Sequence, residues 1–172
     1  PAAYLLAALA EAFPTDAVFL CVVDPGVGGA RAPLVVEADG RRYVGPDNGL
    51  FEIVLRRSAR SRVSRITWTP TRLSASFHGR DLFAPVAAKL ASGAEVPTAD
   101  VAGTEVQHPE WPDDLAEIIY IDHFGNAMTG LRAAPLALDA VMVAGESRIS
   151  YARVFSEVAT GEAFWYENAS GL

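Results

Sequence analysis

Helical and extended patterns of apolar residues alternate along the first half of the chain. The helical patterns occupy residues 2–13, 50–57 and 80–91, and the extended patterns occupy residues 17–23, 34–37, 42–44 and 63–68. Residues 17–23 form a continuous, largely β-branched apolar run, which is typical of a strand buried on both faces of a parallel sheet. The pair Asp39-Gly40 lies between two strand patterns and is a strong signal for a hairpin turn. The alternation predicts an α/β domain over residues 1–93.

A change of composition separates this region from the rest of the chain. In residues 94–114 the sequence turns to Gly, Pro, Thr and acidic residues with little periodicity, so we expect a linker that is longer than ordinary loops. After it, short apolar runs at residues 118–121, 141–143 and 164–166 alternate with turn residues. They predict a small, all-β C-terminal domain over residues 115–172.

The composition is that of a folded, globular protein. The chain has 172 residues, of which 51% are apolar, enough for one large hydrophobic core or two small ones. Its net charge of −7 argues against nucleic acid as a partner, because binding phosphates requires clustered Lys and Arg. The arginines between Arg56 and Arg65 are a local exception, which we interpret as the solvated end of a helix.

The single cysteine indicates the compartment. Cys21 lies inside the apolar run 17–23, so we expect it to be buried and reduced, which excludes a disulfide framework and suits the cytoplasm. No apolar stretch approaches the length of a membrane span and no signal peptide is visible, so we expect no membrane partner. The chain opens on a helical pattern without an N-cap and closes on a turn, and we interpret it as truncated at both ends.

Three polar clusters follow apolar elements, where α/β folds bind their ligands. The first cluster, residues 24–31, begins with Asp24 at the end of the predicted strand and continues through small residues to Arg31, which can return to pair with it. These residues suit either a carboxylate that faces a crevice or a Pro-Gly turn with a structural Asp. They lack the Lys of a phosphate-binding P-loop and the full glycine pattern of a dinucleotide site.

The second cluster, residues 74–81, contains His78 ahead of a predicted helix. A histidine there suits either a base that faces the crevice or a structural role. The three histidines and one cysteine of the chain are dispersed without metal-ligand spacing, so we expect no metal site.

The third cluster, residues 120–129, carries Asp122, Phe124 and Asn126 after a predicted strand. A carboxylate, an aromatic ring and an amide suit the recognition of an ammonium group and a heterocycle. The same residues also suit an Asx-type turn between strands.

Read together, the clusters resemble the SAM hydroxide adenosyltransferases, also called S-adenosylmethionine hydrolases, which share a superfamily with the fluorinase and chlorinase. The matching segments are VVDPGVGGAR, GPDNGL, SFHGRDLFAPVAAKLASG, DHFGN and ENASGL. These five motifs, in this order, cover nearly the whole chain. The resemblance implies an enzyme that hydrolyses S-adenosyl-L-methionine to adenosine and L-methionine with an activated water. It implies neither a metal nor a redox cofactor.

The resemblance also assigns the catalytic roles. The family's catalytic Asp, Arg and His fall on Asp24, Arg31 and His78. In that assignment Asp24 and His78 polarise the water, and Arg31 fixes the carboxylate. A sulfonium is a good leaving group, so C5′ of the substrate needs only an aligned nucleophile and a dry site. The sequence leaves open how the three residues share the proton.

Substrate-binding positions are implied in the same way. Asp122 matches the carboxylate that receives the methionine ammonium group. Phe124 and Asn126 match the pair that stacks on adenine and hydrogen-bonds to it. Phe155 falls where the family keeps an aromatic ring on the other side of adenine, and Ser170 falls in the turn that holds the methionine end.

The architecture implied by the resemblance is an N-terminal α/β (Rossmann-like) domain followed by a small C-terminal β-barrel. The implied assembly is a homotrimer whose active sites lie between the N-terminal domain of one subunit and the C-terminal domain of its neighbour. Compared with the family, this chain lacks the first strand with its ribose-binding loop and the strand after Leu172. Ser76 replaces a usual Thr, and Gly130 replaces a usual Asn.

Two alternative functions remain beside hydrolysis. One is a non-catalytic module that binds adenosine or S-adenosylmethionine, and the other is an adenosyltransferase that uses halide. Fluorinases carry a Tyr at the position of Asp24, Tyr-Ser at the positions of His78 and Gly79, and a long insertion before residues 46–49. This chain has none of these features, so we expect water to be the nucleophile.

Overall fold

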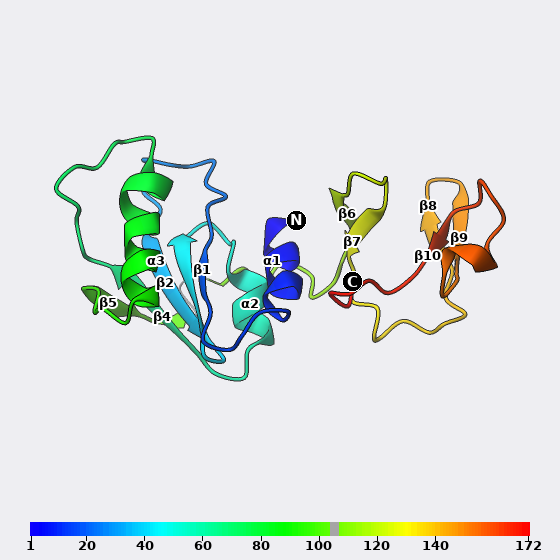
Figure 1. Ribbon diagram of the computed structural model, residues 1–172, viewed down its shortest axis with the longest axis horizontal. Helices are drawn as coiled ribbons and strands as arrows, with labels where there is room; N and C mark the ends of the chain where they lie inside the picture. Colours follow the sequence, from blue (N-terminus) through cyan, green and yellow to red (C-terminus); the bar gives the residue numbers. More distant parts are fainter. Residues whose placement is uncertain (104–106) are drawn as a thin grey trace. The chain divides into compact units, whose positions relative to one another are not determined.

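The computed structural model describes residues 1–103 and 107–172, which form two compact units (Figure 1). The N-terminal unit is Ala2–Asp113 and the C-terminal unit begins at Asp114 and ends at Leu172. The linker expected over residues 94–114 includes a strand, and its residues 104–106 lie outside the described residues.

A five-stranded sheet forms the centre of the N-terminal unit. Its strands are β1 (Val18–Leu20), β2 (Pro33–Ala38), β3 (Arg41–Pro46), β4 (Ser61–Ile66) and β5 (Thr98–Val101), in the order β1-β3-β2-β4-β5. β1 runs parallel to β3, and the other neighbours are antiparallel. The helices are α1 (Ala2–Ala10), α2 (Glu52–Arg57) and α3 (Ala84–Ala91), with the π-helix η1 (Gly79–Phe83) leading into α3. This mixture of helices and strands confirms the predicted α/β class.

The hairpin predicted at Asp39-Gly40 joins β2 to β3. The two residues have positive φ angles of 47° and 91°, as a type I′ turn requires. The Asp39 carboxylate also accepts hydrogen bonds from the backbone N–H groups of Ala59 at 3.0 Å and Arg60 at 2.9 Å. These bonds lower the pKa of Asp39 and tie the turn to the residues just before β4.

The two faces of this sheet pack against different partners. On one face Val35, Val44 and Ile66 pack against η1 and α3, where Phe83 and Val86 are fully buried. The alternation of side chains along each strand sends the neighbouring residues to the opposite face.

Aromatic rings dominate that opposite face. The rings of Phe13, Phe19, Tyr43 and Phe51 follow one another with centroids 4.9 to 6.3 Å apart. Phe51 is the N-cap residue of α2, and α1 packs against α2 (Figure 1). One face of the sheet is therefore covered by α3, and the aromatic rings on the other face lead to α2 and to α1, which packs against it.

The strand predicted over residues 17–23 is shorter and more exposed than its composition indicates. β1 contains three residues at one edge of the sheet, and the apolar side chains of Leu20, Val22 and Val23 are 49%, 46% and 52% exposed. The predicted burial on both faces is wrong because β1 ends at Leu20, so Val22 and Val23 lie outside the sheet. β1 is also an edge strand, with one partner strand, β3, among the described residues. Cys21 is buried as predicted, and burial raises the pKa of its thiol to about 12.

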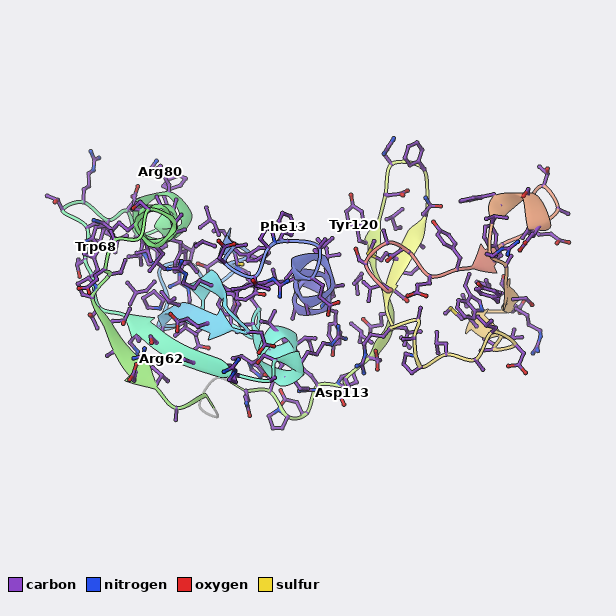
Figure 2. The ribbon with its side chains drawn as sticks, turned by 60° about the horizontal axis from the view of Figure 1, so that its bottom comes forward. Phe13, Arg62, Trp68, Arg80, Asp113 and Tyr120 are labelled. Atoms are coloured by element: carbon purple, nitrogen blue, oxygen red, sulfur yellow. The ribbon has the colours of Figure 1, made fainter. Side chains whose placement is uncertain are left out.

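The arginines from Arg56 to Arg65 do not form one solvated helix end. α2 ends at Arg57, and Arg62 and Arg65 belong to β4 because the chain enters the sheet at Ser61. Figure 2 shows Arg62 on β4, where it pairs with Asp100 of β5 at 2.7 Å. That prediction is therefore wrong for the arginines on the strand.

Residues 108–113 are fastened to α2 by a buried carboxylate. Glu52, 2% exposed, pairs with Arg56 and accepts the backbone N–H of His108 at 2.7 Å. Arg56 in turn donates to the carbonyl of Trp111 and to Asp113, both at 2.8 Å. The last part of the expected linker is thus held against the N-terminal unit.

The C-terminal unit contains two small sheets. β6 (Leu115–Ile121) pairs with β7 (Ala127–Gly130), and β8 (Met142–Ala144), β9 (Ser147–Tyr151) and β10 (Phe164–Trp165) form a second sheet in the order β10-β9-β8. The predicted strands near residues 118–121, 141–143 and 164–166 correspond to β6, β8 and β10. Neither sheet closes on itself within the described residues. None of the described helices is long and apolar enough to cross a membrane.

Candidate active site

Two loops of the N-terminal unit leave the sheet at the same end, where the carboxyl ends of β1 and β3 lie. Because β1 and β3 are parallel, their carboxyl ends point the same way, and the N–H of Cys21 still bonds to Val44 O at 2.8 Å. The loop of residues 24–31 therefore begins beside the turn of residues 46–49. The loop contains two tight turns, with Val27 N bonded to Asp24 O at 3.3 Å and Gly29 N bonded to Gly26 O at 3.0 Å.

Asp24 and Arg31 form a bidentate ion pair across this loop. Arg31 Nε donates to Asp24 Oδ1 at 2.9 Å, and Arg31 Nη2 donates to Oδ2. The two side chains are 5% and 10% exposed, and the guanidinium carbon lies 5.3 Å from the centre of the Phe83 ring. Two parallel charge-assisted bonds fix the plane of the carboxylate as well as its position.

His78 contacts the same guanidinium group. Arg31 Nη2 lies 2.9 Å from His78 Nδ1. A guanidinium group can only donate, so a hydrogen bond at this contact requires Nδ1 as the acceptor, which is the tautomer that carries its hydrogen on Nε2. The structure thus brings together all three of the residues expected to be catalytic, although His78 follows Arg31 by 47 positions.

Two glycines allow close approaches near Asp24 and His78, one in the loop of residues 24–31 and one at the first residue of η1. A Cβ atom on Gly28, which has a φ angle of +79°, would lie 2.5 Å from Ala75 O. A Cβ atom on Gly79 would lie 2.9 Å from Val22 Cγ1. Only glycine fits these close approaches without displacement of its neighbours, and these two positions were missed from the sequence as functional positions.

Asp81 holds the chain just before His78. Its Oδ2 accepts the backbone N–H of Ser74 at 2.9 Å, and its Oδ1 accepts Arg80 Nε at 2.6 Å (Figure 2 labels Arg80). The bond from Arg80 and then the bond from Ser74 lower the pKa of Asp81 to about 2. Asp81 lies in η1, and π-helical turns are frequent at functional sites. This conformation was not predicted from the sequence.

A cavity in the same unit lies elsewhere. It has a volume of about 70 Å³ and is lined by residues of α1, α2 and the β2–β3 hairpin, without Asp24, Arg31 or His78. Ligand pockets usually measure about 300–1,000 Å³, so this cavity is too small for a nucleoside.

In the C-terminal unit, Asp122 and Asn126 close a tight turn between β6 and β7. Asp122 Oδ1 accepts the backbone N–H groups of Phe124 and Asn126, both at 2.9 Å, and Oδ2 accepts Asn126 Nδ2 at 2.8 Å. The side-chain bond from Asn126 is the largest cause of the lowered pKa of Asp122. The local geometry is therefore the Asx-type turn. Two carboxylate oxygens offer about four acceptor positions, so capacity remains for a ligand.

The other residues expected to bind substrate occupy separate segments of this unit. Phe124, at the tip of the turn, is 79% exposed. Phe155 starts the 3-10 helix η3 (Phe155–Glu157), is 64% exposed and contacts the rings of Phe164 and Tyr166. Ser170 donates its backbone N–H to Asn168 Oδ1 at 2.8 Å in the last turn. In residues 1–103 and 107–172, no three His, Cys, Asp or Glu side chains are grouped to hold a metal ion.

Comparisons with known proteins match both units. The model of the SAM hydroxide adenosyltransferase N-terminal domain matches residues 1–100, and that of the C-terminal domain matches residues 116–172. An (R)-S-adenosyl-L-methionine hydrolase from Thermus thermophilus is 39% identical, with 99% of this chain and 72% of the relative covered. One of the same name from Salinispora arenicola is 35% identical, with 96% and 70% covered.

Two solved structures share the fold. The first is the crystal structure of an uncharacterized conserved protein from Thermotoga maritima, with a TM-score of 0.77 and 27% identity. The match covers 99% of this chain and 72% of the Thermotoga chain. The second is the crystal structure of a conserved hypothetical protein from Thermus thermophilus, with a TM-score of 0.74 and 34% identity. The match covers 99% of this chain and 69% of the Thermus chain.

Proposed function

Because the chain belongs to the SAM hydroxide adenosyltransferase family, we propose that it is an enzyme that hydrolyses S-adenosyl-L-methionine to adenosine and L-methionine. The observation that carries the proposal is the contact of Asp24, Arg31 and His78 at one edge of the sheet, in a chain 39% identical to an (R)-S-adenosyl-L-methionine hydrolase.

In the proposed reaction a water oxygen attacks C5′ of the substrate. The O–C5′ bond forms while the C5′–S bond breaks, and its electron pair leaves with sulfur, which turns the sulfonium into the neutral thioether of methionine. The water gives up one proton. The reaction balances without an oxidant, a reductant or a metal, and we propose that no cofactor takes part.

The arrangement of the three side chains supports a division of roles. Asp24 carries a carboxylate that can only accept hydrogen bonds, so it suits the acceptance of the water proton. His78, with Nδ1 occupied by Arg31, presents Nε2–H as a donor to the water oxygen. Arg31 holds both partners in place. A preorganised pair of this kind orients the nucleophile before the substrate reacts.

Substrate binding is proposed for the C-terminal residues. Asp122 would receive the methionine ammonium group, and the acceptor position left beside its three hydrogen bonds supports that role. Phe124 would stack on adenine and Asn126 would hydrogen-bond to it, with Phe155 on the other side of the base. The exposed rings of Phe124 and Phe155 support such stacking. Ser170 would contact the methionine end.

We also propose a homotrimer in the cytoplasm, with each active site between the N-terminal domain of one subunit and the β-barrel of its neighbour. The exposed apolar side chains of Val22, Val23 and Phe77, close in sequence to Asp24 and His78, support an assembly that covers them. The buried free thiol of Cys21 suits a reducing compartment.

The direct test is to incubate the full-length protein with S-adenosyl-L-methionine and to separate the products by chromatography. We expect adenosine and methionine in equal amounts, and no 5′-halogenated nucleoside when chloride, bromide or fluoride is added. Binding without products would favour a non-catalytic binding module. Halide-dependent formation of a halogenated nucleoside would show that the nucleophile is halide and not water.

A further inference from the structure

The turn of residues 46–49 holds both ends of the loop that carries Asp24 and Arg31. On one side, Asp47 donates its backbone N–H to Ala32 O, next to Arg31, at 2.8 Å. On the other side, Asn48 Nδ2 donates to Val23 O, next to Asp24, at 2.8 Å. The Arg31 end is therefore held by the backbone, whereas the Asp24 end is held by a side chain.

The Asn48 side chain acts where the sheet pairing of β1 has ended. β1 pairs with β3 as far as Leu20, and the N–H of Cys21 bonds to Val44 O one residue later. The carbonyl of Val23 then receives its hydrogen bond from Asn48. Asn48 is itself held, because its Oδ1 accepts the N–H of Leu50 at 3.3 Å.

The Val23 carbonyl and the Asp24 N–H belong to one planar peptide group. A hydrogen bond to the oxygen of this group restricts the rotation of the peptide plane. The Asp24 Cα lies in that plane, so the bond also restricts the direction of the Asp24 side chain. Arg31 holds the far end of that side chain through its two bonds. The position of the carboxylate is thus set from the backbone by Asn48 and from the side chain by Arg31.

We propose that Asn48 is a positioning residue for the hydrolysis reaction, which acts by fixing the Val23–Asp24 peptide and through it the Asp24 carboxylate. The proposal rests on the function proposed above. Asn48 does not touch the substrate in this role. Its loss should therefore reduce turnover and leave substrate binding nearly unchanged, because a misplacement of about 1 Å in the group that orients the water can cost about 100-fold in rate.

The variant that tests this is Asn48→Ser. Serine is uncharged and can still accept the N–H of Leu50 in an ST-turn, but it is too short to reach Val23 O. The matched control is Ser92→Ala, which removes an exposed 2.8 Å bond from a side-chain donor to a backbone carbonyl, Lys89 O, at the end of α3. We expect kcat of Asn48→Ser to fall about 10- to 100-fold with KM within about twofold, and kcat of Ser92→Ala to be unchanged.

A double-mutant cycle separates positioning from a general loss of structure. In an Asp24→Asn background, Asn48→Ser should cause less than about a twofold further loss of kcat, because the group it positions is gone. Normal kcat in Asn48→Ser, an effect on KM alone, or a full loss of kcat in both backgrounds would overturn the proposal. An inactive wild-type protein would instead reject the hydrolase function itself, together with this role.

Discussion

A single guanidinium group organises the residues of the N-terminal site. Arg31 donates to both oxygens of Asp24 and lies 2.9 Å from Nδ1 of His78, and a hydrogen bond at that contact leaves the carboxylate as an acceptor and the imidazole Nε2–H as a donor. A lysine could not replace it, because an ammonium group lacks the planar fork that meets a carboxylate twice. The proposed activation of water therefore depends on the hydrogen-bonding positions of Asp24 and His78 that Arg31 does not occupy.

The first prediction concerns Asp24 and His78, the two groups proposed to orient the water. Asp24→Asn keeps the shape but removes the charge, so we expect kcat to fall about 10²- to 10⁴-fold with little change in KM. His78→Ala should have a similar effect. The double variant should lose much less than the product of the two single losses, because the groups act as one unit. Steady-state kinetics of the three variants would check this, and near-normal turnover of Asp24→Asn would refute the assignment.

The second prediction concerns the carboxylate in the C-terminal unit. Asp122→Asn removes the charge but keeps an oxygen that can accept the N–H groups of Phe124 and Asn126. The Asn126 amide, which donates to Oδ2 in the wild type, can turn over and accept from the new NH2 group, so the turn should persist. Losing the partner of the substrate ammonium group should raise KM about 10-fold or more, with kcat at saturating substrate much less affected; a hydrogen bond to a charged group is worth about 1.5–3 kcal/mol. A loss of kcat at unchanged KM would contradict this role.

At the scale of elements, the site depends on how closely two loop segments pack. The loop after β1 approaches the segment before η1 at Gly28, whose hypothetical Cβ atom meets Ala75 O at 2.5 Å. A side chain there would also have to adopt a φ angle of +79°. The contact between Arg31 and His78 joins the same two segments. Backbone packing and the contact between Arg31 and His78 are therefore linked.

The third prediction follows from this packing. Gly28→Ala should lower the free energy of unfolding by about 1–3 kcal/mol, because of the strained φ angle and the clash, and should reduce kcat as His78 moves away from Arg31. The matched control is Gly26→Ala, since a Cβ atom on Gly26 has nothing within 4 Å. Urea unfolding and kinetics would compare the two variants. Equal effects of Gly28→Ala and Gly26→Ala would show that the close approach is unimportant.

At the scale of the whole molecule, the residues expected at one active site are divided between two compact units. Asp24, Arg31 and His78 belong to Ala2–Asp113, and Asp122 belongs to the unit that begins at Asp114. If sites form between subunits, one variant with a damaged N-terminal half and another with a damaged C-terminal half can complement each other.

The fourth prediction is that complementation. Co-expressed Asp24→Asn and Asp122→Asn chains should recover about one quarter of the wild-type activity at substrate well below KM. In randomly mixed oligomers, a site has an intact N-terminal half with a probability of about one half and, independently, an intact C-terminal half with a probability of about one half. The two variants purified separately and assayed together without subunit exchange serve as the control. No recovery in mixed oligomers, isolated through a different affinity tag on each variant, would place each site within one chain.

Part of this protein could be predicted from local sequence alone. The period of apolar residues indicated the helices and most strands, and Asp39-Gly40 indicated its hairpin, because periodicity and turn chemistry are properties of neighbouring residues. The motifs also singled out Asp24, Arg31 and His78, which the structure brings into contact. The roles of these residues, and those of the C-terminal residues, stay predictions.

Only the tertiary structure decided the features that depend on distant segments. The apolar run 17–23 predicted a strand covered on both sides, but β1 is an edge strand, because the number of partner strands is a property of the sheet and not of the run. The contact of Arg31 with His78 and the bond from Asn48 to Val23 O each join residues far apart in sequence. Such contacts arise from the parallel pairing of β1 with β3 and from the packing of η1 against β3 and of α3 against both strands, and no local pattern encodes them.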